Sequence, residues 1–395
     1  MSAAPVKRLG EVCEIRNGAT PDTGDLANWD GPHAWITPAE MGNLESPEVA
    51  ATRRTLTDKG LATCSASLAP VNSVILSSRA PIGHLVINAV PMATNQGCKT
   101  LVPGNQVDYR YLFYFLRANV ALLDSLGTGA TFRELSAGKL RDVEIPVPPL
   151  DEQKRIAAKL DQLLERADCL ERTYRSTEIR SSEALDSEVS AAIRDLSESY
   201  EEKLIGDVLE VARGGSPRPI SEYITDDADG VNWVKIGDAS ASRKYIYETA
   251  EKIKPTGVKR SRKVGPGDFL LSNSMSFGRP YIMQTDGCIH DGWLVLQDKS
   301  SRFDQDYLYY LLGSTTMYSE FSRRAQGSTV QNLNSALVGG VSIPVPPRDV
   351  QERFASQVRT LEEQVHQLIM NVARRLELLS ELRQSVLEAA FRGEL

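Results

Sequence analysis

The chain has 395 residues, of which 41% are hydrophobic and 25% are charged, as in ordinary globular proteins. Its formal net charge of −7 excludes a strongly basic chain, and no apolar run is long enough to predict a membrane span. Five scattered cysteines and an N-terminus without an apolar segment predict reduced thiols, no secretory signal peptide and a cytoplasmic protein.

The negative charge is unevenly distributed. Residues 145–203 contain 9 basic and 14 acidic side chains, so this stretch carries five of the seven excess negative charges. The remaining parts are close to neutral, which leaves them free to bind an anionic partner if their basic groups face one way.

In chain order, the first module begins with Leu9–Ile15, followed by a Gly/Pro turn, and then alternates short β-rich runs with an aromatic helix at 109–117. Each segment has a counterpart near residue 205 onward, at a spacing that drifts from 195 to 198 residues. A period this long indicates a duplicated domain rather than a solenoid.

Each module ends in the same five residues, Ile-Pro-Val-Pro-Pro, at 145–149 and 343–347. A long charged helical pattern follows both copies. Apolar residues recur in it at steps of three and four, which is typical of a coiled-coil seam. The seam positions are Ile156, Leu160, Leu163, Ala167, Leu170, Tyr174, Leu185, Val189 and Ile193 in the first pattern, and Phe354, Val358, Leu361, Val365, Leu368, Val372, Leu376, Leu379, Leu382 and Val386 in the second.

These patterns predict a duplicated α+β (α/β) fold: two globular domains separated by two long antiparallel coiled-coil helices, with a pseudo-two-fold relation. The predicted boundaries are residues 1–149 and 204–347 for the globular domains, and 150–203 and 348–395 for the helices. The alternative is that each helix folds back on its own module.

The sequence contains no recognised catalytic motif: no phosphate loop, no complete dinucleotide fingerprint, no metal-ligand spacing among the four histidines and no methyltransferase motif. Binding without catalysis is therefore the favoured interpretation, and no cofactor is expected on the chain itself.

Loops at equivalent places in both modules are rich in side chains that reach phosphates and base edges. In the first module they are Arg16, Asn17, Thr20, Arg79, Asn95, Gln96, Thr131 and Arg133. In the second they are Arg213, Ser216, Arg218, Lys259, Arg260, Asn273, Ser274, Arg279, His290, Ser328, Thr329, Gln331 and Asn332.

The second module also has six basic residues within 252–263, including Lys259 and Arg260, which indicate a phosphate-binding loop. For any single polar loop residue, simple solvation is the competing explanation.

The chain resembles the specificity subunits of type I restriction–modification systems. The resemblance rests on Leu-Gly-Glu-Val at 9–12 and Ile-Gly-Asp-Val at 205–208, on the two Ile-Pro-Val-Pro-Pro segments, on Asp-Glu-Gln at 151–153 with Asp-Val-Gln at 349–351, and on the terminal residues 387–395.

The resemblance implies a non-catalytic reader of double-stranded DNA, in which each globular domain is a target-recognition domain for half of a bipartite, asymmetric site. It also implies that the helices set the spacer between the half-sites. Expected partners are two methyltransferase (modification) subunits that carry S-adenosylmethionine, and restriction subunits.

Two other classes of function remain open at this stage. A coiled-coil adaptor with two peptide- or protein-binding modules would show no salt-dependent binding to random duplex, whereas a DNA reader would. A stand-alone nuclease or methyltransferase is disfavoured by the missing motifs and would reveal itself by turnover without partners.

Overall fold

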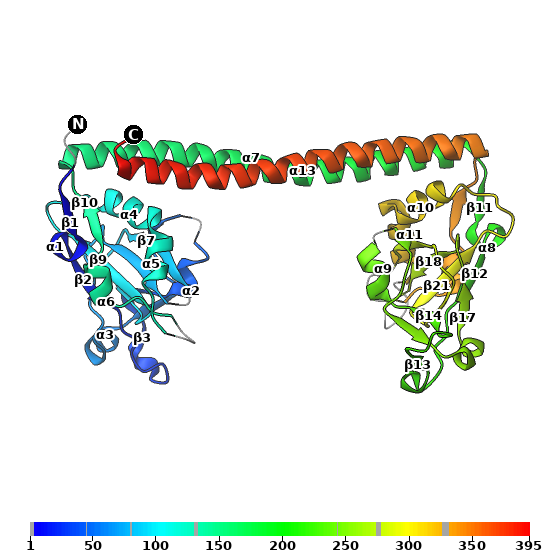
Figure 1. The fold of residues 1–395 in the computed structure, drawn as a ribbon, viewed down its shortest axis with the longest axis horizontal. Helices are drawn as coiled ribbons and strands as arrows, with labels where there is room; N and C mark the ends of the chain where they lie inside the picture. The colour runs from blue at the N-terminus through cyan, green and yellow to red at the C-terminus, as the bar shows by residue number, and fades with distance from the viewer. Residues whose placement is uncertain are drawn as a thin grey trace. The chain divides into compact units, whose positions relative to one another are not determined.

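The computed structural model describes residues 4–44, 46–79, 81–129, 133–242, 244–273, 278–325 and 332–395. The chain divides into two compact units: unit 1 consists of Met1–Tyr174 and Arg374–Leu395, and unit 2 of Arg175–Ala373 (Figure 1). Each unit therefore contains one globular module and a segment of each long helix. No helix in the described ranges is both long and apolar enough to cross a membrane.

Unit 1 has a five-stranded sheet in the order β2-β9-β6-β7-β4, antiparallel except for the β4–β7 pair, and a three-stranded sheet in the order β5-β3-β8. Its strands are β1 (Val6–Arg8), β2 (Cys13–Asn17), β3 (Trp29–Ile36), β4 (Glu48–Val49), β5 (Arg54–Leu56), β6 (Val74–Ser78), β7 (Ile82–Asn88), β8 (Met92–Thr94), β9 (Cys98–Pro103) and β10 (Glu144–Pro146). Its module helices are α1 (Leu9–Val12), α2 (Pro38–Met41), α3 (Asp58–Thr63), α4 (Tyr109–Ala118), α5 (Val120–Ser125) and α6 (Ala137–Arg141).

Unit 2 repeats this plan with two five-stranded sheets, in the orders β12-β21-β18-β19-β15 and β13-β16-β14-β20-β17. Its strands are β11 (Glu202–Leu204), β12 (Glu210–Arg213), β13 (Ile224–Thr225), β14 (Val231–Val234), β15 (Tyr245–Ile246), β16 (Glu251–Ile253), β17 (Arg262–Val264), β18 (Phe269–Ser272), β19 (Pro280–Met283), β20 (Gly287–Ile289), β21 (Trp293–Gln297) and β22 (Ser342–Pro344). Its module helices are α8 (Ile205–Val208), α9 (Ile236–Ser242), α10 (Gln305–Gly313), α11 (Thr315–Ala325) and α12 (Ser335–Gly339). The duplicated mixed α/β fold predicted from the sequence is confirmed.

The repeated Ile-Pro-Val-Pro-Pro segment joins each module to the helix that follows it. Ile145 pairs with Lys7 in the β1–β10 ladder, and Ile343 pairs with Lys203 in the β11–β22 ladder. Because proline has no N–H, these ladders must be short edge pairs.

A buried glutamine fixes the start of each long helix. Gln153 is fully buried; its Oε1 accepts the N–H of Asp108 at 2.8 Å, and its Nε2 donates to two carbonyls. Gln351 makes the same set of bonds in unit 2, accepting from Asp304 N at 2.7 Å. This explains why glutamine stands at the third position of both Asp-Glu-Gln and Asp-Val-Gln.

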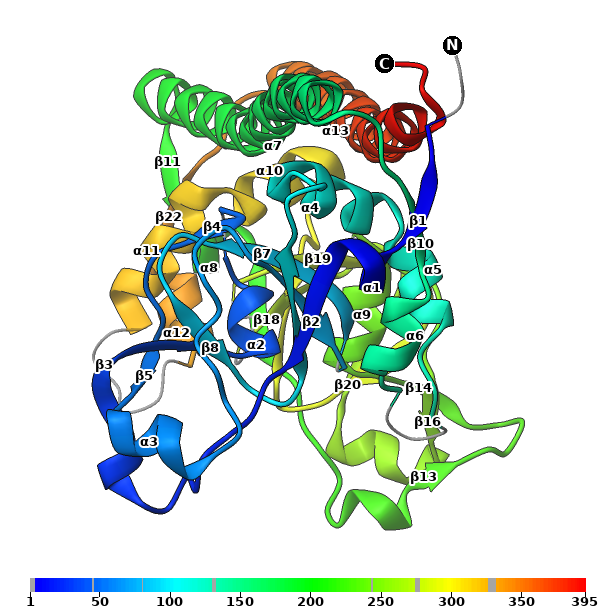
Figure 2. The same ribbon diagram turned by 90° about the vertical axis from the view of Figure 1, so that its left-hand side faces the viewer.

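The two long helices are α7 (Leu150–Ser199) and α13 (Arg348–Arg392). In unit 1 the start of α7 lies beside the end of α13, and both pack on the module core through Leu160 and Leu387. In unit 2 the end of α7 and the start of α13 do the same through Ile193 and Phe354. The helices thus run antiparallel in each unit and also cover its module, with α4 lying between them and the sheet in unit 1 (Figure 2).

The seam predicted from the sequence is partly wrong. Leu170, Leu368 and Leu382 are 45%, 40% and 53% exposed, and Leu164 rather than Leu163 is the buried residue of its pair. Two helices packed on one module cover only part of a continuous apolar stripe, so positions that face neither partner remain in solvent.

Candidate nucleic-acid interface

Each unit presents a tight turn between two strands at the same place in its fold. In unit 1 the turn 95–97 connects β8 to β9, and in unit 2 the turn 290–292 connects β20 to β21. A Gly/Pro loop lies over each turn: residues 18–21 after β2, and residues 214–217 after β12.

The same backbone hydrogen bonds hold the loop and the turn together in both units. Gly18 N donates to Cys98 O, and Gly214 N donates to Trp293 O. The next residue of each loop donates to the residue just before the turn, Ala19 to Thr94 O and Gly215 to Ile289 O. A further matched pair runs from Ser78 N to Gly97 O and from Asn273 N to Gly292 O. The scaffold is therefore defined by backbone groups and does not depend on the side chains that it displays.

In unit 1 the scaffold displays neutral side chains. Thr20 Oγ1 donates to Gln96 Oε1, and Asn95 Oδ1 accepts the N–H of Gly97 at 2.9 Å. Gln96 and Asn17 are both exposed. These side chains offer amide donors and acceptors without charge, and Arg79 lies against Gly97 of the same turn.

In unit 2 the equivalent side chains converge on Asp291. Its Oδ1 accepts from Ser216 Oγ at 2.5 Å, and its Oδ2 lies 3.4 Å from Arg218. Its backbone carbonyl accepts from Arg213 Nε at 3.0 Å and from Asn273 Nδ2 at 2.8 Å. Four residues predicted from the sequence thus meet at one acid that the prediction did not include.

The electrostatics of this turn follow from these contacts. The hydrogen bond from Ser216, together with nearby Arg218, lowers the pKa of Asp291, so the carboxylate is a permanent acceptor. Burial lowers the pKa of His290, whose Nδ1 accepts the N–H of Gly292 at 2.8 Å, which leaves a neutral imidazole with its proton on Nε2. The turn therefore carries one negative acceptor and one neutral donor next to the Arg218 cation.

The basic residues of 252–263 lie on β16, the following 3-10 helix (Pro255–Arg260) and β17. Lys259 and Arg260 are exposed; Arg260 donates to Tyr223 Oη at 3.0 Å and lies 5.8 Å from that ring. Arg262 Nε lies 3.5 Å from Arg213 O, which brings the segment next to the Gly/Pro loop. The cluster therefore adjoins the Asp291 turn.

Several predicted residues are engaged elsewhere. Arg16 donates to Glu14 and to Leu68 O, and Arg133 donates to Asp124. Arg79 Nη1 lies 3.8 Å from Glu134 Oε2.

Three further predicted residues differ from one another in burial or position. Five others lie outside the described residues. Asn273 is buried and acts within the scaffold, whereas Asn332 is exposed. Arg279 lines a pocket of about 450 Å³ together with Tyr309 and Glu362, so it lies apart from the turn. The predicted residues that fall outside the described ranges are Thr131, Ser274, Ser328, Thr329 and Gln331.

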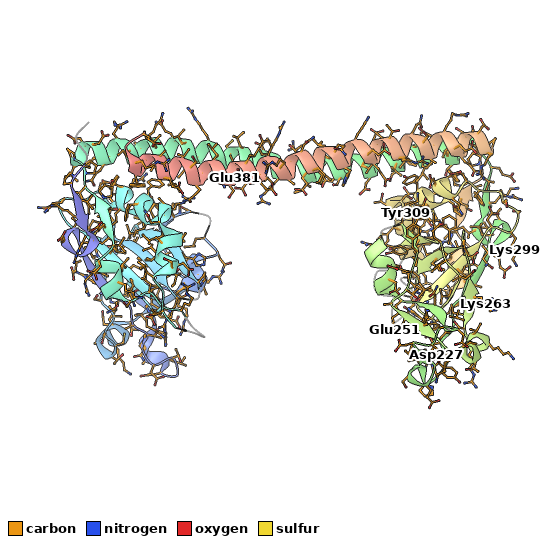
Figure 3. All side chains as sticks on the ribbon, in the orientation of Figure 1. Asp227, Glu251, Lys263, Lys299, Tyr309 and Glu381 are labelled. Atoms are coloured by element: carbon orange, nitrogen blue, oxygen red, sulfur yellow. The ribbon has the colours of Figure 1, made fainter. Side chains whose placement is uncertain are left out.

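Figure 3 shows Asp227 and Glu251 at the end of the unit 2 module that lies away from its helical segments, and Tyr309 beside those segments. Glu251 belongs to β16 and lines an open pocket of about 980 Å³ with Trp233, His290 and Asp291. The Asp291 turn is thus open to a ligand at the end of the module remote from the helices.

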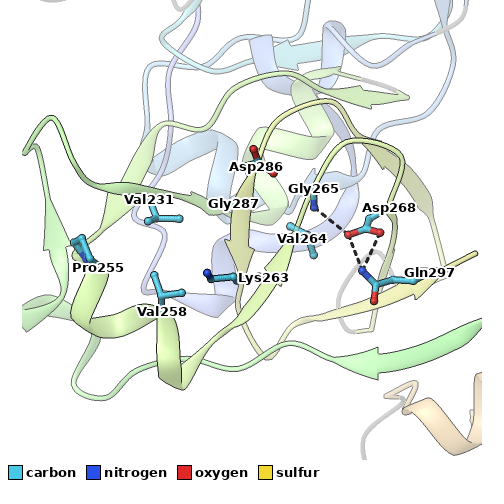
Figure 4. Close-up of a pocket in the computed structure, with 10 residues that line it drawn as sticks. All are labelled: Val231, Pro255, Val258, Lys263, Val264, Gly265, Asp268, Asp286, Gly287 and Gln297. Atoms are coloured by element: carbon cyan, nitrogen blue, oxygen red, sulfur yellow. Dashed lines mark hydrogen bonds between the residues drawn. The ribbon is translucent and has the colours of Figure 1, made fainter. Parts of the chain in front are cut away.

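A second pocket, of about 580 Å³, lies between β17 and the 3-10 helix Pro255–Arg260 (Figure 4). Two acids, Asp268 and Asp286, line it. Asp268 accepts from Gly265 N at 3.0 Å and from Gln297 Nε2 at 2.9 Å, so its carboxylate serves the fold. Of the basic cluster, only Lys263 lines it.

The described ranges contain no group of metal ligands, and two of the buried thiols are held in the protonated form. No three His, Cys, Asp or Glu residues come together there as metal ligands. Burial raises the pKa of Cys13 and Cys98 to about 12, so both thiols stay protonated at neutral pH.

The chain matches the family model described as "Type I restriction modification DNA specificity domain" at residues 2–179 and again at 197–375. It is 27% identical over 419 aligned positions to the type I restriction enzyme MjaIX specificity subunit of Methanocaldococcus jannaschii, covering 99% of this chain and 93% of that one. The EcoBI specificity subunit of Escherichia coli is 23% identical over 77% of this chain and 70% of its own length.

Solved structures share the fold. A chain from a study of "complex assembly and conformational transition of the type I R-M system" superposes with a TM-score of 0.76 at 20% identity, covering 100% of this chain and 99% of that chain. The HsdS subunit from Thermoanaerobacter tengcongensis gives a TM-score of 0.65 at 20% identity, covering 100% and 98%. With two copies of the domain matched along nearly its whole length, the chain belongs to the family of type I restriction–modification DNA specificity proteins.

Proposed function

We propose that this chain is the DNA-recognition subunit of a type I restriction–modification complex and that it reads a bipartite, asymmetric site with one module per half-site. The observation that carries this proposal is the matched pair of turns: one backbone scaffold, built twice, displays Thr20 and Gln96 in one unit and Ser216 and Asp291 in the other. A shared scaffold with different exposed chemistry suits two different base sequences.

The recognition domains in this proposal are residues 1–149 and 204–347, and the helical regions are residues 150–203 and 348–395. The basic cluster beside the Asp291 turn would neutralise phosphates, which position a protein on duplex DNA. In unit 1 the candidate contacts are Asn17 and Gln96, because both are exposed.

The helical regions are the proposed docking surface for two methyltransferase subunits and for the restriction subunits. Leu170 on α7 and Leu368 on α13 occupy equivalent positions in the two copies, and they remain 45% and 40% exposed. Exposed leucines repeated at equivalent places suit two identical partners. Methyl transfer would then occur on the partner, with S-adenosylmethionine bound there, and in the cytoplasm where the DNA is.

The test is to map methylated adenines in a host that carries the partner methyltransferase gene, with and without the gene for this chain. The expected result is a two-part motif with an unspecified spacer that is methylated only when this chain is present. An ungapped motif, or one that does not depend on this chain, would contradict the proposal.

A second test addresses the partners. Leu170→Asp or Leu368→Asp alone should leave one methyltransferase subunit bound per chain, and the double variant should leave none, as measured by the mass of the purified complex. Leu378→Asp, at an exposed position of α13 without an equivalent apolar residue in the other copy, is the control. Two bound subunits in the double variant would mean that these leucines do not form the docking surface.

A further inference from the structure

Asp291 supports the loop and is still accessible at the surface. Its side chain is 43% exposed and that of Arg218 is 80% exposed, and both line the open pocket of about 980 Å³. Ser216 uses only one of the lone pairs of Oδ1, so the carboxylate can accept further hydrogen bonds. The pair thus presents an acceptor and a guanidinium fork next to each other on an open surface.

The position of the acceptor is fixed in advance. Arg213 and Asn273 hold the backbone carbonyl of Asp291, and Ser216 holds its side chain. Because these bonds already exist in the free chain, little conformational entropy is lost when the carboxylate meets a base.

The two groups together match one base pair. In the major groove cytosine presents the N4 amino group as a donor, and its guanine partner presents O6 and N7 as acceptors. A carboxylate accepts from cytosine N4, and an arginine fork donates to guanine O6 and N7. An adenine–thymine pair also presents an amino donor, adenine N6, but its acceptors N7 and O4 lie on either side of that donor, so it offers no adjacent pair of acceptors to the arginine fork.

The equivalent residue in unit 1 has different chemistry. Gln96 is exposed and its Oε1 accepts from Thr20, which fixes the orientation of the amide and turns Nε2 away from that bond. A glutamine amide placed in this way can accept from adenine N6 and donate to adenine N7.

We propose that Asp291 and Arg218 read a C·G base pair in one half-site and that Gln96, at the equivalent turn, reads an adenine in the other. The inference rests on the proposed function and adds to it the residues that determine specificity. The difference between the two half-sites then arises from one pair of equivalent positions on a common scaffold.

The experiment measures equilibrium binding of the complex of this chain with its methyltransferase to duplexes that carry each of the four base pairs at every position of both half-sites. The wild-type complex should prefer C·G at one position by about 5- to 150-fold, as expected for a good base contact. Asp291→Ala should abolish that preference at that position alone, and Asp291→Gln should convert it to A·T. Gln96→Asp should produce the converse change in the other half-site.

The controls separate recognition from support. Asp227→Asn changes an exposed acid of the same unit whose hydrogen bonds are local to Thr225, and it should leave every preference unchanged. Arg218→Ala removes a highly exposed side chain and should weaken the preference for the same base pair, even if the Asp291 variants fold poorly.

Two results would overturn the inference. Asp291 and Arg218 variants that weaken binding to all duplexes alike would show that the pair only supports the loop. A preference for a pair other than C·G that persists in the Asp291→Gln variant would show that other residues read the base. If the wild-type complex itself shows no two-part preference, the proposed function fails, and the two failures are thus distinguishable.

Discussion

At the scale of single residues, two glycines allow the Gly/Pro loop to pack on the turn in each unit. A Cβ on Gly18 would lie 1.8 Å from Asn95 O, and a Cβ on Gly214 would lie 2.0 Å from His290 O. Both neighbours are backbone atoms of the turn itself, which cannot move aside as a flexible side chain can. The close approach of loop and turn therefore requires glycine at both positions.

Gly18→Ala and Gly214→Ala should each reduce the free energy of unfolding by about 1–3 kcal/mol, because the added methyl group overpacks the scaffold. Urea denaturation of the full chain measures this. Gly237→Ala, where a Cβ meets nothing within 4 Å, is the matched control and should change stability by less than about 1 kcal/mol. Equal effects at all three positions would mean that the loop adapts to the extra atom.

His290 should make the stability of unit 2 depend on pH. Its pKa in the folded chain is below the ordinary value because of burial, so the unfolded chain binds more protons once the pH falls below about 6.5. The free energy of unfolding should therefore fall as the pH drops from the unfolded pKa to the folded one.

The matched variant is His290→Asn, since Asn95 already accepts the same bond from Gly97 in unit 1. It should remove that part of the pH dependence in denaturation curves recorded between pH 5 and 8. An unchanged slope would assign the dependence to other groups.

The candidate site shows which residue-scale features the sequence can predict. The loops at 17–20, 95–96, 213–218 and 290 were identified because polar residues recur at equivalent places. The sequence did not point to Asp291, because a negatively charged side chain is an unusual choice for binding an anionic ligand such as DNA. Its role becomes visible only when four side chains from two distant segments meet at it, and a linear pattern contains no such information.

At the scale of elements, the contact between module and helix carries the same ion pair in both units with the charges exchanged. In unit 1 Arg110 on α4 pairs with Asp161 on α7 at 2.8 Å. In unit 2 the equivalent residues are Asp306 on α10 and Arg359 on α13. At this contact the first part of each long helix therefore carries the charge that complements the module preceding it.

Arg110→Asp should destabilise unit 1 by about 1 kcal/mol, a modest value because both side chains are more than a third exposed. Adding Asp161→Arg reproduces the arrangement of unit 2 and should restore part of the loss, although Glu48 also contacts Arg110. A double-mutant cycle on the denaturation midpoints measures the coupling between positions 110 and 161. A coupling energy of zero would show that exchanging the two charges has no energetic consequence.

The presence of two long helices could be predicted because a sustained 3-4 apolar repeat is typical of a helix, but α7 ends at Ser199 and α13 at Arg392, before residues 203 and 395. The sequence did not predict which positions of the repeat are buried, since Leu368 and Leu382 fit the repeat and yet lie in solvent. Leu160→Asp, at a position with no exposure, should therefore cost about 2–5 kcal/mol, as large core disruptions do, whereas Leu368→Asp should leave the free energy of unfolding nearly unchanged. Thermal unfolding of the two variants side by side makes the comparison.

At the scale of the whole molecule, an acidic chain can bind DNA only if its basic groups act locally. The net charge is −7, and the basic cluster of unit 2 adjoins the Asp291 turn. Binding of the methyltransferase complex to random duplex should fall steeply with salt, with a slope of roughly −0.9 per phosphate contact.

Variants that each remove one positive charge test which residues of the basic cluster contribute to this salt dependence. Lys259→Ala and Arg260→Ala should each reduce the slope by about one without altering base preference. Lys299→Ala, at an exposed lysine paired with Glu210, is the control and should leave the slope unchanged. If the affinity for random duplex did not depend on salt, the proposal that the cluster binds phosphates would be contradicted.

The backbone-defined turn also has a consequence for inheritance. Because the hydrogen bonds that build it come from main-chain amides and carbonyls, a change at position 96 or 291 alters what is displayed while the support stays in place. On the proposed assignment of these positions to base contacts, a single codon change would give a lineage a new pattern of marked DNA without a period of misfolded protein. Two such positions in one gene would let each half of the pattern diverge independently of the other.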